Sequence, residues 1–123
     1  MNLQTIFTKV KDHLLKQNRK CFEEGVGERC MYRQGELSCA VGVLIPDEMY
    51  SDKMEHQDVE TLLNENYRGF KDLFEFESYD MVTLIDRQKV GLLKELQEIH
   101  DEDFVWCWEI QLKKLSKEFD LDW

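Results

Sequence analysis

The sequence predicts an α+β fold, namely a mostly α-helical single domain over residues 1–123 with one small β-hairpin. Apolar residues recur at helical spacing near both ends of the chain, and a short alternating segment followed by a turn pair lies near residue 34. With 123 residues, 42% hydrophobic residues and one proline, the chain has a globular composition and enough length for one core.

The first helix is predicted over residues 3–18, with Asn2 as its N-cap. Residues 21–29 include two glycines and are expected to form a loop. The apolar positions of the helix are Leu3, Ile6, Phe7, Val10, Leu14 and Leu15.

The hairpin is expected after this loop. Residues 30–32 alternate and favour a strand, and the Gln34-Gly35 pair is typical of a hairpin turn. Ser38 is expected to cap a short helix over residues 39–44.

The middle of the chain is less regular. Asp58 is expected to cap a short amphipathic helix, residues 64–79 form an irregular segment rich in aromatic residues, and residues 81–85 indicate a strand or a buried turn.

Two further helices complete the pattern. Asp86 is predicted to cap the first, residues 101–103 interrupt it, and Asp103 is predicted to cap the second. The apolar positions are Val90, Leu92, Leu93, Leu96 and Ile99 in the first helix and Phe104, Cys107, Trp108, Leu112, Leu115 and Phe119 in the second.

The net charge of −10 favours a basic protein partner and disfavours nucleic acid. The first 20 residues are basic, so the remaining residues are more acidic than the total suggests. No apolar run reaches the length of a membrane span, and the N-terminus lacks the features of a signal peptide. A cytoplasmic location is therefore expected, with free thiols at the four cysteines.

Cys39 is the candidate nucleophile, because a helix N-terminus lowers the pKa of a thiol. His100 and Asp101 could complete a Cys-His-Asp arrangement. The apolar run after Cys39 favours a buried packing thiol instead, so the sequence indicates a non-enzymatic protein and leaves a hydrolase open.

No metal or other cofactor is expected, because no two potential ligands lie at the close spacing of zinc sites. A small anionic ligand such as a nucleotide is a further possibility. Arg33 or Arg68 would bind it beside the aromatic segment.

The partner-binding residues are predicted where aromatic side chains alternate with carboxylates, since interfaces concentrate binding energy in aromatic anchors. Trp106 is added because Trp108, two residues later, should face the core and turn Trp106 outward. The predicted contact residues are Phe74, Glu75, Phe76, Glu77 and Trp106.

Residues 30–50, CMYRQGELSCAVGVLIPDEMY, resemble a motif of small bacteriophage and prophage proteins. Residues 93–101, LKELQEIHD, resemble a second motif in the same proteins. The resemblance implies a phage origin and a shared fold, and assigns no catalytic residue. It favours proteins that block or redirect host factors, including defence systems.

The leading hypothesis is therefore a non-enzymatic, acidic interaction protein that binds a host protein with a basic surface, for example a defence or nucleic-acid-binding factor. The alternatives are a binding protein for a nucleotide-like anion and a hydrolase that uses Cys39 and His100.

Overall fold

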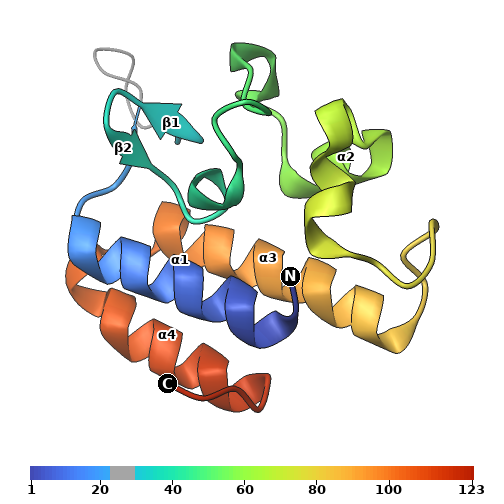
Figure 1. Ribbon diagram of the computed structural model, residues 1–123. Coiled ribbons are helices and arrows are strands. Elements are labelled where there is room, and N and C mark those ends of the chain that lie inside the picture. The colour runs from blue at the N-terminus through green and yellow to red at the C-terminus, as the bar shows by residue number, and fades with distance from the viewer. Residues whose placement is uncertain (23–29) are drawn as a thin grey trace.

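The computed structural model describes residues 1–22 and 30–123, so most of the loop predicted over residues 21–29 lies outside the described residues. Three long helices form one layer: α1 (Leu3–Gln17), α3 (Leu84–Glu102) and α4 (Trp108–Glu118) (Figure 1). A second layer of shorter elements covers them. The mostly helical α+β class is confirmed.

α1 begins and ends as local chemistry dictates. Asn2 is the N-cap, and its side-chain oxygen accepts a hydrogen bond from the backbone N–H of Thr5 at 2.8 Å. Asn18 ends the helix in the left-handed conformation, with φ 51°. The predicted helix is confirmed to within one residue. It buries Ile6, Phe7, Val10 and Leu14.

The hairpin consists of β1 (Arg33–Gln34) and β2 (Leu37–Ser38), paired antiparallel with Arg33 opposite Ser38. Gly35 takes the left-handed backbone, with φ 61°, that the turn requires. The small hairpin is confirmed, but its strands begin after the predicted residues 30–32. Its turn is Gly35-Glu36, one residue later than the predicted Gln34-Gly35 pair, because Gln34 pairs with Leu37 in the sheet.

The helix predicted over residues 39–44 is wrong. Ser38 belongs to β2, and only a 3₁₀ turn, η1 (Gly42–Leu44), follows. The backbone of Cys39, just after the hairpin, lies close to that of Tyr32, just before it. The N–H of Cys39 donates a hydrogen bond to the carbonyl of Tyr32. A Cβ at position 42 would overlap that carbonyl oxygen, so only glycine fits.

The central segment contains η2 (Asp52–Met54), α2 (Val59–Glu65) and η3 (Tyr67–Phe74). Asp58 caps α2 as predicted, since its carboxylate accepts from the N–H of Thr61 at 2.8 Å. The aromatic-rich segment is thus partly a 3₁₀ helix.

α3 begins at Leu84 and is capped by Thr83, not by Asp86. The strand or buried turn predicted over residues 81–85 is therefore wrong. η4 (Val105–Cys107) precedes α4, so Asp103 does not cap that helix. Phe104 consequently leaves the predicted apolar face and is 69% exposed.

One hydrophobic cluster joins the two layers. α1 packs on α3, α4 and η1, and α2 packs on α3. No helix of the described residues is long and apolar enough to cross a membrane. The largest fully buried side chains are Trp108, Phe7, Phe70, Phe74, Ile6 and Leu14.

Candidate functional site

The structure divides the predicted contact residues between two places. Glu75 and Glu77 are exposed next to the start of α3, whereas Trp106 follows its C-terminal end. Trp106 is 77% exposed, which confirms the predicted orientation. Phe76 is half-buried against the core.

Phe74 is a correction to the predicted contact set, because its side chain is completely buried. Its ring meets Phe70 edge-on with centroids 5.3 Å apart, and Phe76 lies 6.2 Å away. Phe74 is therefore a core residue beneath the acidic segment and presents no surface to a partner.

Residues 75–83, here called the 75–83 loop, connect η3 to α3. A buried carboxylate holds one part of its backbone: Asp86 accepts from the N–H of Glu77 at 2.7 Å and of Ser78 at 2.9 Å. Burial opposes the ionisation of Asp86, but these hydrogen bonds outweigh burial and lower the pKa of its carboxyl group.

Two buried lysines, Lys71 and Lys89, contact the backbone of this segment at further points. The ammonium group of Lys89 donates to the carbonyl oxygens of Phe74 at 2.6 Å and Glu75 at 3.1 Å. The ammonium group of Lys71 donates to the carbonyl oxygen of Tyr79 and lies over its ring. Buried charged side chains thus hydrogen-bond to the loop backbone at residues 75 and 77–79.

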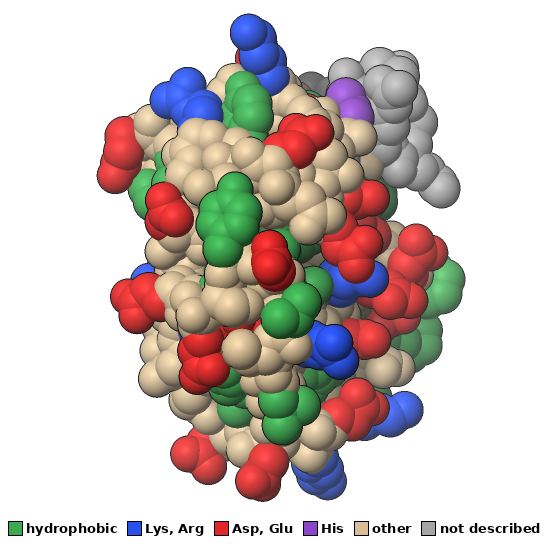
Figure 2. Space-filling model, turned by 90° about the vertical axis from the view of Figure 1, so that its right-hand side faces the viewer, with side chains coloured by type: hydrophobic (Ala, Val, Ile, Leu, Met, Phe, Trp, Pro, Cys, Tyr) green, Lys and Arg blue, Asp and Glu red, His purple; other side chains and the backbone are tan. Residues whose placement is uncertain are grey.

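The 75–83 loop and the first residue of α3 display apolar side chains. Tyr79 is 78% exposed, Val82 56% and Leu84 76%, and we call these three residues the Tyr79 patch. Glu75, Glu77 and Asp80 are also exposed, and Figure 2 shows hydrophobic side chains among acidic ones on this face.

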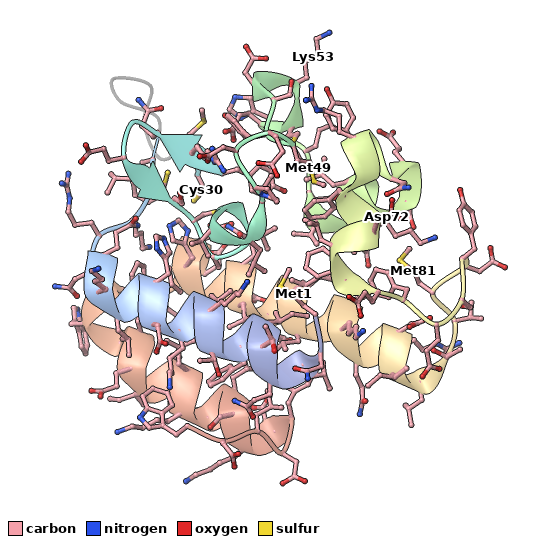
Figure 3. All side chains as sticks on the ribbon, in the orientation of Figure 1. Met1, Cys30, Met49, Lys53, Asp72 and Met81 are labelled. Atoms are coloured by element: carbon pink, nitrogen blue, oxygen red, sulfur yellow. The ribbon has the colours of Figure 1, made fainter. Side chains whose placement is uncertain are left out.

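Met81 has the opposite orientation. Its backbone is left-handed, with φ 55°, and its N–H donates to the carbonyl of Ser78 at 3.1 Å. Its side chain lies between the loop and α2 (Figure 3) and lines a hollow with Leu63. Sequence reasoning missed the Tyr79 patch. The spacing of Thr83 and Asp86, which resembles a capping box, is the signal that could have placed Leu84 in the first turn.

The C-terminal end of α3 leads to a second group of exposed apolar residues. The rings of Phe104 and Trp106 stack with centroids 5.9 Å apart and planes 9° apart, and we call them the aromatic pair. Ile110 is 60% exposed one helical turn beyond Trp106.

The Cys39 thiol is completely buried. Its sulfur donates to the side-chain oxygen of Gln97 at 3.1 Å and accepts from the N–H of Gly42 at 3.2 Å. Burial raises the pKa of this thiol far above its ordinary value. Cys39 therefore has the environment of a packing residue.

His100 is buried, and both ring nitrogens have partners. Its Nε2 accepts from the backbone N–H of Cys21 at 3.0 Å, so Nδ1 carries the proton and donates to Asp101 at 2.7 Å. No nitrogen of His100 is left to take a proton from Cys39. The geometry gives the hydrolase no support.

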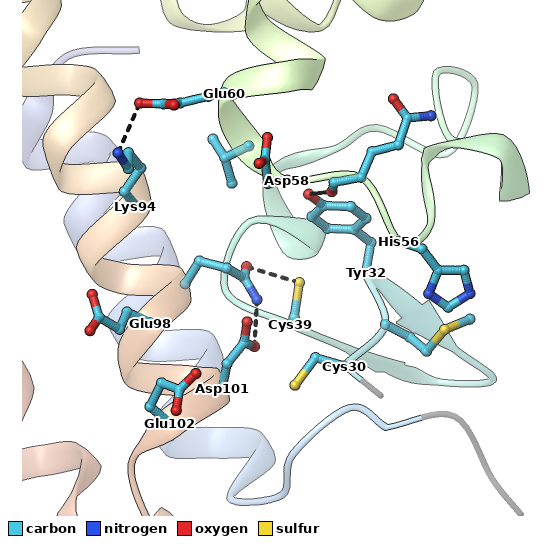
Figure 4. Close-up of a pocket in the computed structure, with 14 residues that line it drawn as sticks. Cys30, Tyr32, Cys39, His56, Asp58, Glu60, Lys94, Glu98, Asp101 and Glu102 are labelled. Atoms are coloured by element: carbon cyan, nitrogen blue, oxygen red, sulfur yellow. Dashed lines mark hydrogen bonds and ion pairs between the residues drawn. The ribbon is translucent and has the colours of Figure 1, made fainter. Parts of the chain in front are cut away.

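A cleft of about 380 Å³ lies between the hairpin, the start of α2 and the C-terminal half of α3 (Figure 4). The Cys30 sulfur lies within 4.8 Å of ligand atoms of His100 and Asp101. Burial, with Asp101 nearby, raises the pKa of the Cys30 thiol to about 12. Because Nδ1 of His100 carries a proton and Nε2 accepts from Cys21, neither ring nitrogen offers a free lone pair to a metal, and Cys30 and Asp101 are the two remaining ligands of this cluster.

The lining of the cleft does not suit an anion. Among the described residues, the one lysine or arginine that lines it is Lys94, which is paired with Glu60 at 2.8 Å. Arg33 instead contacts Asp47 at 2.7 Å, and Arg68 donates to the carbonyl of Glu48. The carboxylates that line the cleft are Asp58, Glu60, Glu98, Asp101 and Glu102.

Comparisons with protein-family models, with curated proteins and with solved structures give no match.

Proposed function

We propose that this chain is a non-enzymatic interaction protein that binds a basic protein partner through the Tyr79 patch. The observation that carries the proposal is that three exposed apolar side chains lie on the 75–83 loop and the first residue of α3. Buried charged groups hydrogen-bond to the backbone of this loop at residues 75 and 77–79. A loop already ordered before binding loses little conformational entropy when a partner covers it.

The charge of the partner follows from the surroundings of the patch. Glu75, Glu77 and Asp80 are exposed on the 75–83 loop, and we call them the acidic rim. The N-terminal ammonium group lies 3.9 Å from Glu75, and the whole chain carries −10. Complementary charge accelerates association and disfavours acidic partners. Apolar anchors in the centre would then supply most of the affinity.

The kind of partner is proposed from the resemblance of residues 30–50 and 93–101 to phage and prophage proteins. Such a protein would bind a basic host factor, for example a defence or nucleic-acid-binding protein, and block or redirect it. The Cys39 and His100 geometry supports a role without catalysis, because neither group is available for proton transfer.

Affinity capture with three forms of the full chain tests this proposal: wild type, the double variant Tyr79→Ser/Leu84→Ser, and Leu15→Ser. Leu15 is a matched control, because it is 36% exposed on α1, away from the patch. The expected result is a host protein of basic surface that wild type and the control retain and the double variant loses.

Titration calorimetry with that purified protein then measures its affinity for each form. Equal affinity of the double variant and wild type would contradict the role of the Tyr79 patch. Failure of wild type to retain any basic protein would contradict the proposed function itself.

A further inference from the structure

We infer that the aromatic pair, together with Ile110, is a second docking surface that receives an arginine-bearing segment of a protein partner. It lies at the opposite end of α3 from the Tyr79 patch, and α3 is about 28 Å long at 1.5 Å per residue. This site is separate from the one proposed above and can be tested without it.

The geometry of the pair suits a flat cation. Phe104 is 69% exposed and Trp106 77%, and their parallel rings offer broad faces to solvent. A planar guanidinium stacks on such a face and is attracted by the ring quadrupole, most strongly by that of tryptophan.

The other exposed aromatic rings of the described residues already carry a cation of the chain. Trp123 has the ammonium groups of Lys11 at 4.7 Å and Lys113 at 5.2 Å from its ring centroid. Tyr79 has that of Lys71 at 3.6 Å. The half-buried Tyr50 shows the same arrangement with the Arg33 guanidinium at 4.8 Å.

Phe104 and Trp106 differ from these rings: within residues 1–22 and 30–123, no basic side chain lies over either of them. The pair is thus an exposed aromatic site of the type that this molecule elsewhere covers with a cation. We assign a cation at this site to a protein partner.

Local charge favours a cation, and the planar donor geometry of the guanidinium favours arginine over lysine. Glu102, Asp103 and Glu109 are sequence neighbours of the pair, and Glu109 pairs with Lys113 at 3.8 Å. A guanidinium on Trp106 can donate in its own plane to a neighbouring carboxylate, which the compact ammonium group of lysine does less well. Ile110 would cover the aliphatic stem of the arginine.

The test uses three synthetic peptides, with four Arg, four Lys or four Gln residues separated by Gly-Ser, titrated into the full chain. Tryptophan indole N–H resonances report the contact, and Trp106→Leu identifies the resonance of Trp106. We expect a saturable shift of that resonance with the arginine peptide. The lysine peptide should bind more weakly, because a compact ammonium group cannot stack on the ring as a planar guanidinium does, and the glutamine peptide should cause no shift.

Trp123→Leu is the matched control, because Trp123 is exposed but already covered by Lys11 and Lys113. Trp106→Leu should weaken arginine-peptide binding and Trp123→Leu should not. The Tyr79→Ser/Leu84→Ser variant should bind the arginine peptide as tightly as wild type does. If the arginine peptide does not bind Trp106, the proposal for the Tyr79 patch therefore still stands.

Three outcomes would overturn the inference. The first is an unmoved Trp106 resonance, and the second is equal affinity for the arginine and lysine peptides. The third is concentration-dependent self-association, measured by sedimentation, that Trp106→Leu abolishes, because the surface would then bind a second copy of the chain.

Discussion

The two ends of α3 expose apolar side chains in different ways. At the N-terminal end, the buried groups of Asp86 and Lys89 reach outward and hold the backbone of the 75–83 loop. At the C-terminal end, the aromatic pair is ordered by its own stacking and by the short turn η4. Interior changes should therefore disturb the first surface and leave the second intact.

Phe74→Ala should have the largest effect on stability. The ring is completely buried beneath the loop, and its removal leaves a cavity. The expected loss is about 3–5 kcal/mol in the free energy of unfolding, measured by urea denaturation. A loss below about 1 kcal/mol would show that the segment is loosely packed.

Asp86→Ala should be the next most destabilising change. It leaves the part-buried N–H groups of Glu77 and Ser78 without their acceptor, at a cost of about 1–3 kcal/mol. Amide exchange at these two residues should accelerate, while the Trp106 indole resonance stays in place. A shift of that resonance would show that the two ends of α3 are coupled.

The same carboxylate predicts a pH dependence. Its folded-state pKa lies below the ordinary value of 3.8, so its contribution to stability is present above that pH and is lost as pH falls through the folded-state pKa. The difference in unfolding free energy between wild type and Asp86→Asn should be constant near neutral pH and shrink in acid. If the difference in unfolding free energy stays unchanged in strong acid, the ionised Asp86 carboxylate is not the source of the stability.

Charge reversal tests the rim of the Tyr79 patch. Glu75→Lys/Glu77→Lys should slow association with the basic partner on the order of tenfold at low salt. The effect should fade as salt shortens the Debye length to about 8 Å. Glu36→Lys/Glu118→Lys, at exposed positions elsewhere, changes the net charge equally and should have a smaller effect in stopped-flow measurements.

Phe104→Ala should have the smallest effect on stability. Its ring buries little surface, so the free energy of unfolding should change by less than about 0.5 kcal/mol. Thermal unfolding of this variant beside Phe74→Ala compares an exposed and a buried phenylalanine directly. A large loss would mean that the aromatic pair stabilises the fold and is not kept exposed for a partner.

Sequence reasoning succeeded where the decisive contacts are local. Asn2 and Asp58 cap helices through hydrogen bonds to residues three positions ahead, a spacing visible in the sequence. Asp86 also has the chemistry of a cap. Its carboxylate instead accepts from Glu77 and Ser78, nine and eight residues earlier, and Thr83 caps the helix.

The predicted exposure of the contact residues was right for some residues and wrong for others, again according to whether local sequence decides it. Glu75 and Glu77 are exposed as expected, because carboxylates without a buried partner stay in water. Phe74 and Phe104 are the same residue type, yet one is buried and the other exposed. Their burial depends on where η3 and α4 begin relative to the core. The spacing of apolar residues did not predict those starting residues.

The sequence by itself determined the helical class, the first helix and its cap, the hairpin turn at Gly35 and the acidic character of the chain. The apolar run after Cys39 also predicted its burial, which the structure confirms. Tertiary structure alone decided the roles of His100 and the 75–83 loop. His100 accepts from the N–H of Cys21, 79 residues earlier in the chain, and that contact sets its tautomer. Helix caps depend on neighbours along the chain, whereas the protonation and exposure of these groups depend on distant segments that only folding brings together.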